Sequence, residues 1–218
     1  MSWESTDIYY QEINRLIKYR LGGLHSAQII LYSVNFEEIE QLQRNAQWDK
    51  AGEILAAIAM KLEKAGADAI ALCTNTMHKV ADQIEQAIQV PFLHIADSTI
   101  KHIQMQKYSK IGLLGTAFTM EQDFYKANFF DAGIEVFIPN EIDRRIVHDV
   151  IYQELCKGVL NASSKEKYQI IMNKLEAYGA EALILGCTEI GLLIQDHDLP
   201  LLDTTKLHIQ DIVDFILQ

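Results

Sequence analysis

The sequence predicts an α/β protein made of two related halves, and two observations carry that prediction. Short β-rich runs alternate with stretches of helical apolar periodicity, which is the pattern of parallel βα units with helices on both faces of a sheet. An internal repeat of one helix, one glycine and one buried strand then divides the chain in two. The 218 residues, of which 49% are hydrophobic, suffice for one large domain or two small ones.

The predicted strands and helices alternate along the whole chain. Each predicted strand is a short β-rich run, and each predicted helix carries an apolar stripe at helical spacing. The predicted strands are residues 28–33, 69–73, 92–95, 111–114, 135–138, 182–185 and 201–202. The predicted helices include residues 7–19, 48–65, 78–89, 120–132, 144–157, 165–178 and 205–217.

The internal repeat aligns residues 62–72 with residues 175–185 without a gap. Each copy reads as a helix that stops at a glycine and is followed by one buried strand. A second match, between Pro91-Phe92-Leu93 and Pro200-Leu201-Leu202, marks the next strand of each half. The chain is therefore expected to contain the same α/β unit twice.

Polar residues follow both copies of the repeated strand. Continuing the alignment pairs Thr74 with Cys187, Asn75 with Thr188, and Thr76 with Glu189. In parallel sheets, ligands bind beyond the carboxyl ends of the strands, where the following helix offers its first N–H groups. We therefore predict an N-terminal α/β half, residues 1–107, that carries Thr74, and a C-terminal α/β half, residues 108–218, that carries Cys187.

Composition and charge exclude several classes of partner. The net charge of −11 repels nucleic acid and anionic lipid, and no stretch is rich in lysine and arginine. The chain has neither a glycine-rich phosphate loop nor a zinc-type Cys/His spacing, so we predict no cofactor and no metal. Three distant cysteines predict free thiols. Without a secretory start or an apolar run of about 18 residues, the expected location is the cytoplasm.

The duplicated arrangement suits the inversion of a carbon centre. Racemising an amino acid requires removal of the α-proton from one face and return of a proton on the other, so two acid/base groups must flank one carbon. Without an electron-sink cofactor, hydrogen-bond donors must stabilise the carbanion. The candidate donors are Asn75, Thr76, Thr116 and Thr188. Cys187 stands at a predicted helix start, where we expect a lowered thiol pKa and a usable thiolate near neutral pH.

Three motifs, taken together and in order along the chain, resemble the aspartate/glutamate racemase superfamily. They are Asn75-Thr76-x-His78, Leu114-Gly115-Thr116 and Gly186-Cys187-Thr188-Glu189. With the start Met1-Ser2-Trp3-Glu4, the set is similar to the broad-specificity amino-acid racemase subgroup. The resemblance implies a pseudo-symmetric two-domain fold and a homodimer. It also implies two-base racemisation, without pyridoxal phosphate, of aspartate, glutamate or a broader set such as homoserine.

The sequence departs from that family in two places. Most relatives have a cysteine where Thr74 stands, and Cys73 lies one position earlier. Because adjacent strand residues face opposite sides, we place Thr74 in the site and Cys73 in the packing. Relatives also have a strand of the type Ile-Gly-Leu-Leu-Gly-Gly before the position of Met1. The first strand of the N-terminal half is therefore expected to be missing, which would leave two sheet edges exposed.

We predict Thr74 and Cys187 as the catalytic pair. The predicted substrate-binding residues are Met1, Gln43, Asn75, Thr76, Thr116, Thr188 and Glu189. Structural roles stay open for several of them: Cys187 as core packing, Thr74 as a helix cap, and Gln43 in a solvated loop. Glu189 can orient Cys187 or simply stabilise a helix start. For His78 a structural role is favoured over a catalytic one.

Two other functions stay open. The first is a different reaction on the same scaffold, either decarboxylation of a malonate or isomerisation of maleate, each using one cysteine. The second is a non-catalytic or impaired binding protein derived from a racemase. Thr74 in place of a thiol and the missing strand both favour this second alternative.

Overall fold

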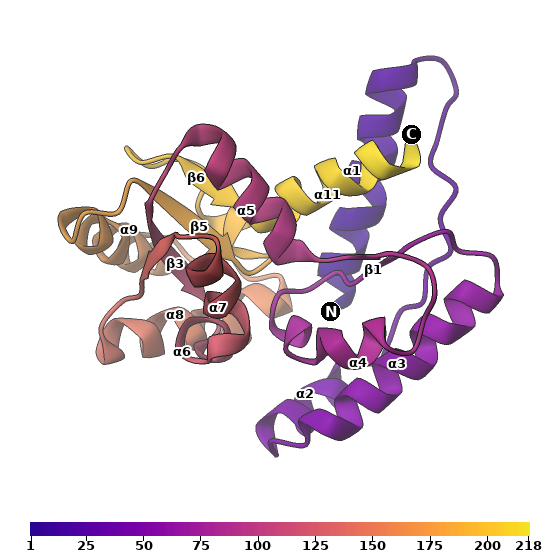
Figure 1. The fold of residues 1–218 in the computed structure, drawn as a ribbon. Coiled ribbons are helices and arrows are strands. Elements are labelled where there is room, and N and C mark those ends of the chain that lie inside the picture. Colours follow the sequence, from indigo (N-terminus) through magenta and orange to yellow (C-terminus); the bar gives the residue numbers. More distant parts are fainter. The chain divides into compact units, whose positions relative to one another are not determined.

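The computed structural model describes all residues from 1 to 218, and the chain forms two compact units. Unit 1 comprises Met1–His94 and His208–Gln218, and unit 2 comprises Ile95–Leu207 (Figure 1). Each unit contains a parallel sheet and several helices. The predicted α/β class with two parallel-sheet halves is confirmed. The boundary between residues 107 and 108, which the repeat suggests, stays a prediction.

Unit 1 is mostly helical around a very small sheet. Its elements are α1 (Trp3–Leu21), α2 (Phe36–Arg44), α3 (Trp48–Lys64), β1 (Ile70–Ala71), η1 (Thr76–Val80), α4 (Ala81–Glu85), β2 (Phe92–Leu93) and, from His208 onward, α11 (Thr204–Ile216). The buried face of α3 packs against η1 and α4 around Leu55, Met77 and Ile84. A second cluster joins α1 to α11 through Ile17 and Val213.

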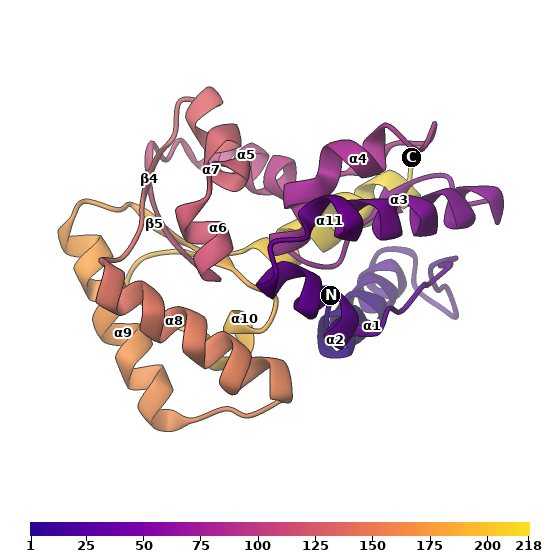
Figure 2. The same cartoon turned by 90° about the horizontal axis from the view of Figure 1, so that it is seen from below.

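Unit 2 contains the larger sheet. Its elements are α5 (Ile95–Gln106), β3 (Lys110–Gly115), α6 (Ala117–Glu121), α7 (Asp123–Asp131), β4 (Glu135–Phe137), α8 (Glu141–Gln153), η2 (Leu155–Lys157), α9 (Ala162–Ala177), β5 (Ala182–Gly186), α10 (Ile190–Leu193) and β6 (Leu201–Asp203). The strand order is β4-β3-β5-β6, and every pair is parallel. Figure 2 shows α8 and α9 side by side, and both contact β3.

The central pair of strands, β3 and β5, is close-packed and apolar along the paired residues. Their register runs from Ile111 beside Ala182 to Gly115 beside Gly186. A side chain at Gly186 would place its Cβ 2.9 Å from the carbonyl oxygen of Leu114, and one at Gly115 would come 3.1 Å from the carbonyl oxygen of Gly186. The two strands therefore leave no room for side chains where they meet at their carboxyl ends.

The internal repeat is also a structural repeat. Gly66 and Gly179 follow α3 and α9 with φ values of +97° and +100°, a left-handed conformation that glycine adopts without strain. The next turn is the same in both copies, because Ala67 and Ala180 each donate a 3.1 Å backbone hydrogen bond to the carbonyl five residues earlier. The following strands repeat as well: the N–H groups of Ile70 and Leu183 each donate at 2.9 Å to a proline carbonyl.

The predicted strand over residues 28–33 is wrong, because the structure has no strand there. The sheet of unit 1 contains only β1 and β2, paired in parallel as Ile70 with Phe92 and Ala71 with Leu93. A strand needs a neighbour for its backbone N–H and C=O groups, and residues 28–33 have no partner strand. In Figure 1 this segment belongs to the long connection between α1 and α2. Ile30, Leu31 and Tyr32 are each about half exposed there.

Several helices differ from the sequence prediction, because some predicted helices are divided and others were not predicted. Three predicted helices are each divided: 78–89 into η1 and α4, 120–132 into α6 and α7, and 144–157 into α8 and η2. Gln122, for example, is extended with ψ of 152° and interrupts its helix. Helices α2, α5 and the four-residue α10 are absent from the predicted set. The nine-residue α2 has only Ile39 and Leu42 as buried apolar side chains, too few for a clear period. None of the helices is both long and apolar enough to cross a membrane.

Gly186→Ala should lower the free energy of unfolding by about 1–3 kcal/mol, because the new Cβ would press on main-chain atoms of β3 that cannot turn away. Urea unfolding followed by circular dichroism measures this. Gly191→Ala is the matched control: its Cβ would meet Asp203 Oδ2 at 2.6 Å, and a carboxylate can rotate, so the cost should be smaller. Wild-type stability in Gly186→Ala would contradict the close approach of β3 and β5.

Candidate active-site residues

Cys187 is the first residue after β5, and its thiol is held by a neighbouring carboxylate. The residue is only 9% exposed, and Sγ donates a hydrogen bond to Glu189 Oε2 at 3.1 Å. The hydroxyl of Thr188 donates to the same oxygen, and the Cys156 thiol donates to Oε1 across 3.9 Å. Glu189, itself buried, thus accepts hydrogen bonds from three side chains. The prediction that it can orient Cys187 is consistent with this geometry.

The expectation of a low thiol pKa at Cys187 is wrong. Burial raises the pKa well above the ordinary value, and the negative charge of Glu189 raises it further. The helix after Cys187 cannot offset this, because α10 has only four residues and the macrodipole of a single turn is small. The thiol is therefore neutral at rest. Glu189 is in position to accept its proton when a thiolate is needed.

Thr116 lies on the adjacent strand end of unit 2. It follows Gly115, which pairs with Gly186, so Thr116 and Cys187 both extend from the same rung of the sheet. Its hydroxyl caps α6 by accepting from the N–H of Thr119 at 3.3 Å. The sheet therefore brings together four of the predicted residues at one edge: Thr116, Cys187, Thr188 and Glu189.

Thr74 is positioned by a tight turn of the backbone in unit 1. Its N–H donates to the carbonyl of Leu72 at 2.8 Å, and its own carbonyl accepts from His78 Nδ1 at 2.7 Å. Strand β1 ends at Ala71, so alternation along a strand does not decide which way Thr74 faces. The repeat register alone supports pairing it with Cys187. Thr74 as a catalytic residue stays a prediction.

Cys73 is half-buried against the cluster that contains Ala71, Leu93 and Tyr9. Burial raises the pKa of its thiol to about 11, and the positive amino terminus opposes this only partly. Its carbonyl oxygen accepts hydrogen bonds from the amino group of Met1 and, at 2.8 Å, from the hydroxyl of Ser5. The side chain of Cys73 therefore packs, as expected, while its main chain anchors the N-terminus.

The other predicted residues of unit 1 lie around the same loop. Asn75 and Thr76 are buried, and Thr76 begins η1. Gln43 is not in a solvated loop but buried in α2, where its amide donates to the sulfur of Met77 at 2.9 Å. Arg44, its neighbour, is exposed and pairs with Glu40 and Glu37. Contact of Met1, Gln43, Asn75 or Thr76 with a substrate stays a prediction.

The sequence prediction missed a cluster of three histidines, of which His78 and His208 are buried and His94 is half-buried. His208 Nε2 donates to the carbonyl of Leu93 at 2.7 Å, and its Nδ1 accepts from the hydroxyl of Tyr9 at 2.8 Å. The ring centroids of His78 and His94 lie 4.4 Å apart, and those of His78 and His208 lie 6.2 Å apart. The available signal was a histidine among the apolar residues of α11. No set of His, Cys, Asp and Glu side chains is grouped so that it could hold a metal ion.

Burial keeps His78 and His208 neutral. It lowers the pKa of His208 to about 4, and it lowers the pKa of His78 well below the ordinary value, with His94 and His208 adding repulsion. The neutral ring of His78 carries its proton on Nδ1, because that atom donates to the Thr74 carbonyl. The cluster therefore supports the loop that carries Thr74 through hydrogen bonds rather than through charge.

In both sequence and structure, the chain is similar to proteins described as Asp/Glu racemases or their homologues. The family model described as Asp/Glu/Hydantoin racemase matches residues 1–212. The chain is 51% identical to a proposed Asp/Glu racemase of known structure from Yersinia pestis, with a TM-score of 0.92 over 100% of this chain and 96% of that one. An aspartate racemase homologue from Pyrococcus horikoshii OT3 is 32% identical, with a TM-score of 0.83 over 99% and 95% of the two chains.

A curated relative also matches over part of its length. It is the broad specificity amino-acid racemase RacX of Bacillus subtilis strain 168, which is 29% identical over 153 residues. The match covers 67% of this chain and 64% of that protein, slightly under two thirds of it.

Glu189→Gln should lower the pKa of the Cys187 thiol, because it removes a negative charge and a charged acceptor that both favour the protonated sulfur. The measurement is the pH dependence of iodoacetamide alkylation, followed by mass spectrometry of the peptide that contains Cys187. The alkylation midpoint of Cys73 in the same sample is the control and should not move. A wild-type Cys187 that already alkylates rapidly at pH 7 would contradict the buried, neutral thiol.

The free energy of unfolding should fall as the pH is lowered from about 6.5 to about 4. In this range His208 takes up a proton in the unfolded chain, whereas the buried ring of the folded chain stays neutral. Folding lowers the pKa of His208. Its contribution to the free energy of unfolding is therefore fully present above the pKa of the unfolded chain and is lost as the pH falls toward about 4. The loss is about 3 kcal/mol at most. Urea unfolding at several pH values measures it in the wild type and in His208→Gln, which should show a weaker pH dependence. The exposed His25, changed to Gln, is the matched control, and an unchanged slope in His208→Gln would refute the assignment.

Proposed function

Because the chain belongs to the Asp/Glu/hydantoin racemase family, we propose that it is a cofactor-independent amino-acid racemase with Thr74 and Cys187 as its acid/base pair. Racemases are isomerases, so the predicted enzyme class is confirmed at the level of the family. The proposal of this acid/base pair rests on where the two residues lie in the repeat. Thr74 and Cys187 occupy corresponding places after the repeated strands, and the two copies share their glycine turn and backbone hydrogen bonds.

Cys187 and Glu189 supply one of the two proton transfers. The thiol gives its proton to the Glu189 carboxylate, and the resulting thiolate takes the α-proton of the substrate from one face. On the other face, the hydroxyl of Thr74, directly or through water, gives a proton to the carbanion and recovers one from solvent. Glu189 releases to solvent the proton that it took from the thiol, so the pair returns to its starting state. A hydroxyl is a much weaker acid than a thiol, so the Thr74 step should limit the rate.

Hydrogen-bond donors must hold the substrate carboxylate and spread the charge of the carbanion. Side chains that can donate hydrogen bonds follow the strands in both units. They are Thr116 and Thr188 in unit 2 and Asn75 and Thr76 in unit 1. Such donors act strongly where water is excluded. Aspartate and glutamate are the first substrates to test, and the broad-specificity relative extends the test to homoserine and aliphatic amino acids.

The proposed setting is a cytoplasmic homodimer. The cysteines Cys73, Cys156 and Cys187 are free thiols, which suits a reducing compartment. The dimer is proposed from the resemblance to the racemase family, and light scattering coupled to size-exclusion chromatography tests it.

One rival function has a specific observation in its favour. A binding protein derived from a racemase would tolerate Thr74 in place of a thiol and a sheet of only two short strands in unit 1. It would bind amino acids without exchanging their α-protons. A decarboxylase on the same scaffold would instead release carbon dioxide. Proton NMR in deuterated water separates the three functions, because only racemisation labels the α-carbon without loss of carbon.

Deuterium exchange at the α-carbon tests both members of the proposed pair. Cys187→Ala and Cys187→Ser should abolish exchange while the circular dichroism spectrum is kept, whereas Cys73→Ala should stay within a few-fold of wild type. Thr74→Cys should raise kcat/KM in both directions by the same factor, since the enantiomers have equal free energy. For the enantiomer whose α-proton faces Cys187, Thr74→Ala should reduce inversion more than exchange, because inversion also needs a proton from the Thr74 side. Wild-type rates in Cys187→Ser would end the proposal, and a complete loss in Cys73→Ala would shift the register by one residue.

A further inference from the structure

His148, a half-buried residue of α8, accepts a hydrogen bond from the start of α6 in unit 2. The donor is the backbone N–H of Ala117, the first residue of α6, and it lies 3.1 Å from Nδ1 of His148. Ala117 directly follows Thr116, one of the proposed donors to the substrate. A side chain from a separate helix thus holds the backbone of the loop that leaves the carboxyl end of β3.

The hydrogen bonds that Thr116 makes with α6 are local. Its hydroxyl accepts from the N–H of Thr119 at 3.3 Å, and its carbonyl accepts from the N–H of Met120 at 2.9 Å. Both stay within one turn, and α6 has only five residues, too few for a helix that is stable by itself. The hydrogen bond from Ala117 to His148 differs, because it ties this turn to the 13-residue α8.

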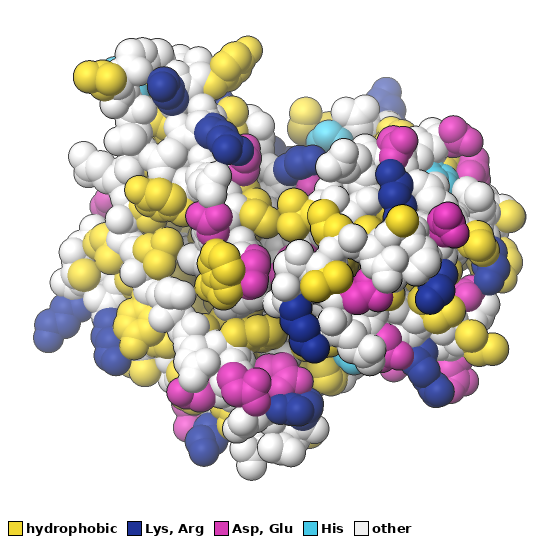
Figure 3. Space-filling view, turned by 180° about the vertical axis from the view of Figure 1, so that it is seen from behind, with side chains coloured by type: hydrophobic (Ala, Val, Ile, Leu, Met, Phe, Trp, Pro, Cys, Tyr) yellow, Lys and Arg dark blue, Asp and Glu magenta, His cyan; other side chains and the backbone are white.

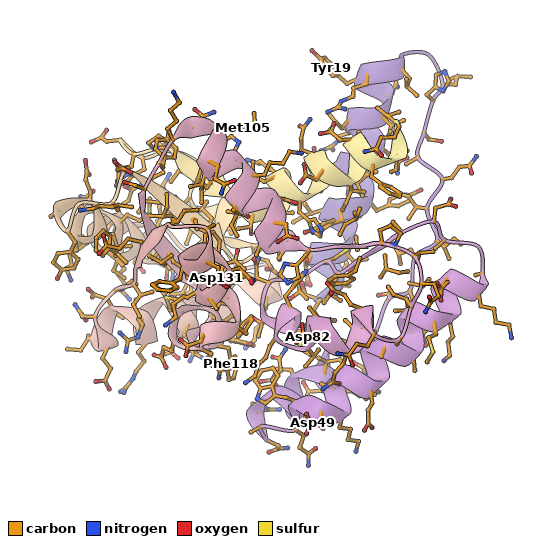
Figure 4. All side chains as sticks on the ribbon, in the orientation of Figure 1. Tyr19, Asp49, Asp82, Met105, Phe118 and Asp131 are labelled. Atoms are coloured by element: carbon orange, nitrogen blue, oxygen red, sulfur yellow. The ribbon has the colours of Figure 1, made fainter.

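This hydrogen bond also fixes the tautomer of His148. Since Nδ1 accepts, the proton of the neutral ring lies on Nε2. Two aromatic rings pack beside the imidazole: Tyr152, with ring centroids 4.8 Å apart, and Phe118, at 6.2 Å. Figure 4 labels Phe118 on α6. A second proton, on Nδ1, would set two N–H groups against each other, and the hydrogen bond to Ala117 would be lost.

The charged groups around His148 are of both signs. Burial lowers the pKa of its ring, and the negative charges of Asp149 and Glu121 oppose this only in part. Glu121 is itself paired with Arg144 at 2.8 Å. Acidic and basic side chains are also interspersed over the face of the molecule that Figure 3 shows. His148 is therefore neutral near pH 7, the form in which Nδ1 can accept.

We propose that His148 is a positioning residue, which holds the loop that carries Thr116 through the Ala117 N–H and does so only while its ring is neutral. Its effect on the rate rests on the proposed racemase function. Protonation of His148 releases the loop, and Thr116 then no longer stands in a fixed place to stabilise the carbanion. A donor that acts mainly on the carbanion affects kcat more than KM.

Two amide substitutions separate the two nitrogens of the ring. His148→Asn places an amide oxygen near the position of Nδ1, so it can still accept from Ala117, whereas His148→Gln places its amide near the position of Nε2. We expect His148→Gln to lower kcat about 10-fold with KM within about 2-fold, and His148→Asn to stay within about 3-fold of the wild type. Asparagine is the poorer helix former of the two, so helix stability cannot explain this order.

The pH dependence of kcat gives a second measurement. As the pH falls through the pKa of His148, which lies below 6.5, kcat of the wild type should fall because the ring takes up a proton. In His148→Asn the amide does not titrate, so kcat should persist to lower pH. His197 is the matched control: its Nδ1 also accepts from a backbone N–H, that of Leu199 at 3.0 Å, but it lies before the amino end of β6. His197→Gln should keep the kcat and pH profile of the wild type.

Nuclear magnetic resonance tests the same contact without turnover. With ¹⁵N-labelled histidine, the ring of His148 should show its proton on Nε2 at pH 7, and the amide signal of Ala117 should titrate with the midpoint of this ring. The protection factor of the Ala117 amide against hydrogen exchange should be about 10-fold lower in His148→Gln than in His148→Asn.

Several results would overturn the proposal. They are a ring proton on Nδ1, equal protection of Ala117 in the two variants, and equal kcat in the two variants. Recovery of kcat in His148→Gln but not in His148→Asn would also overturn it, in favour of a role for Nε2. A wild type that exchanges no α-protons would end the proposed function, whereas the resonance and hydrogen-exchange measurements would still decide whether neutral His148 holds this loop.

Discussion

Parallel backbone pairing at the carboxyl ends of the strands is the constraint on which the proposed site depends. In unit 2, β3 and β5 come so close at Gly115 and Gly186 that no side chain larger than hydrogen fits without movement. This contact fixes the two loops that follow, one carrying Thr116 and the other Cys187. The rigid ladder therefore fixes where the two loops begin, and the thiol, hydroxyls and carboxylate at this edge are placed from these two points.

The sequence predicted the features that local patterns encode. The helix, glycine and strand of each repeat were correct, and the two glycines adopt the same left-handed conformation. Residues 28–33 were misassigned because their composition favours a strand, but a strand also requires a partner that composition cannot reveal. The pKa of Cys187 was misjudged for a similar reason. A helix start suggests a thiolate, whereas burial and the Glu189 carboxylate, both products of tertiary packing, favour the thiol.

The two loops hold their proposed acid/base groups by different means. In unit 2 the Cys187 side chain is fixed through side-chain hydrogen bonds that converge on Glu189. In unit 1 the Thr74 loop is fixed through its main chain, by the carbonyl of Leu72 and by the neutral ring of His78. A hydroxyl needs no charge partner at neutral pH, so neutral surroundings suit it. The proposed reaction requires the Cys187 thiol to ionise, and a thiol that ionises needs a proton acceptor close by, which Glu189 can supply.

The N-terminal residues connect the sheet of unit 1 to its loop. The carbonyl of Cys73, directly before Thr74, accepts hydrogen bonds from Met1 and Ser5, so the position of Thr74 depends on how firmly these residues are held. Because β1 pairs only with β2, Met1 is held at its amino group and by the helix that follows. Small displacements of a catalytic group reduce rates strongly. In the proposed reaction, the placement of Thr74 therefore depends on the backbone contacts of Met1 and Ser5 as well as on its own loop.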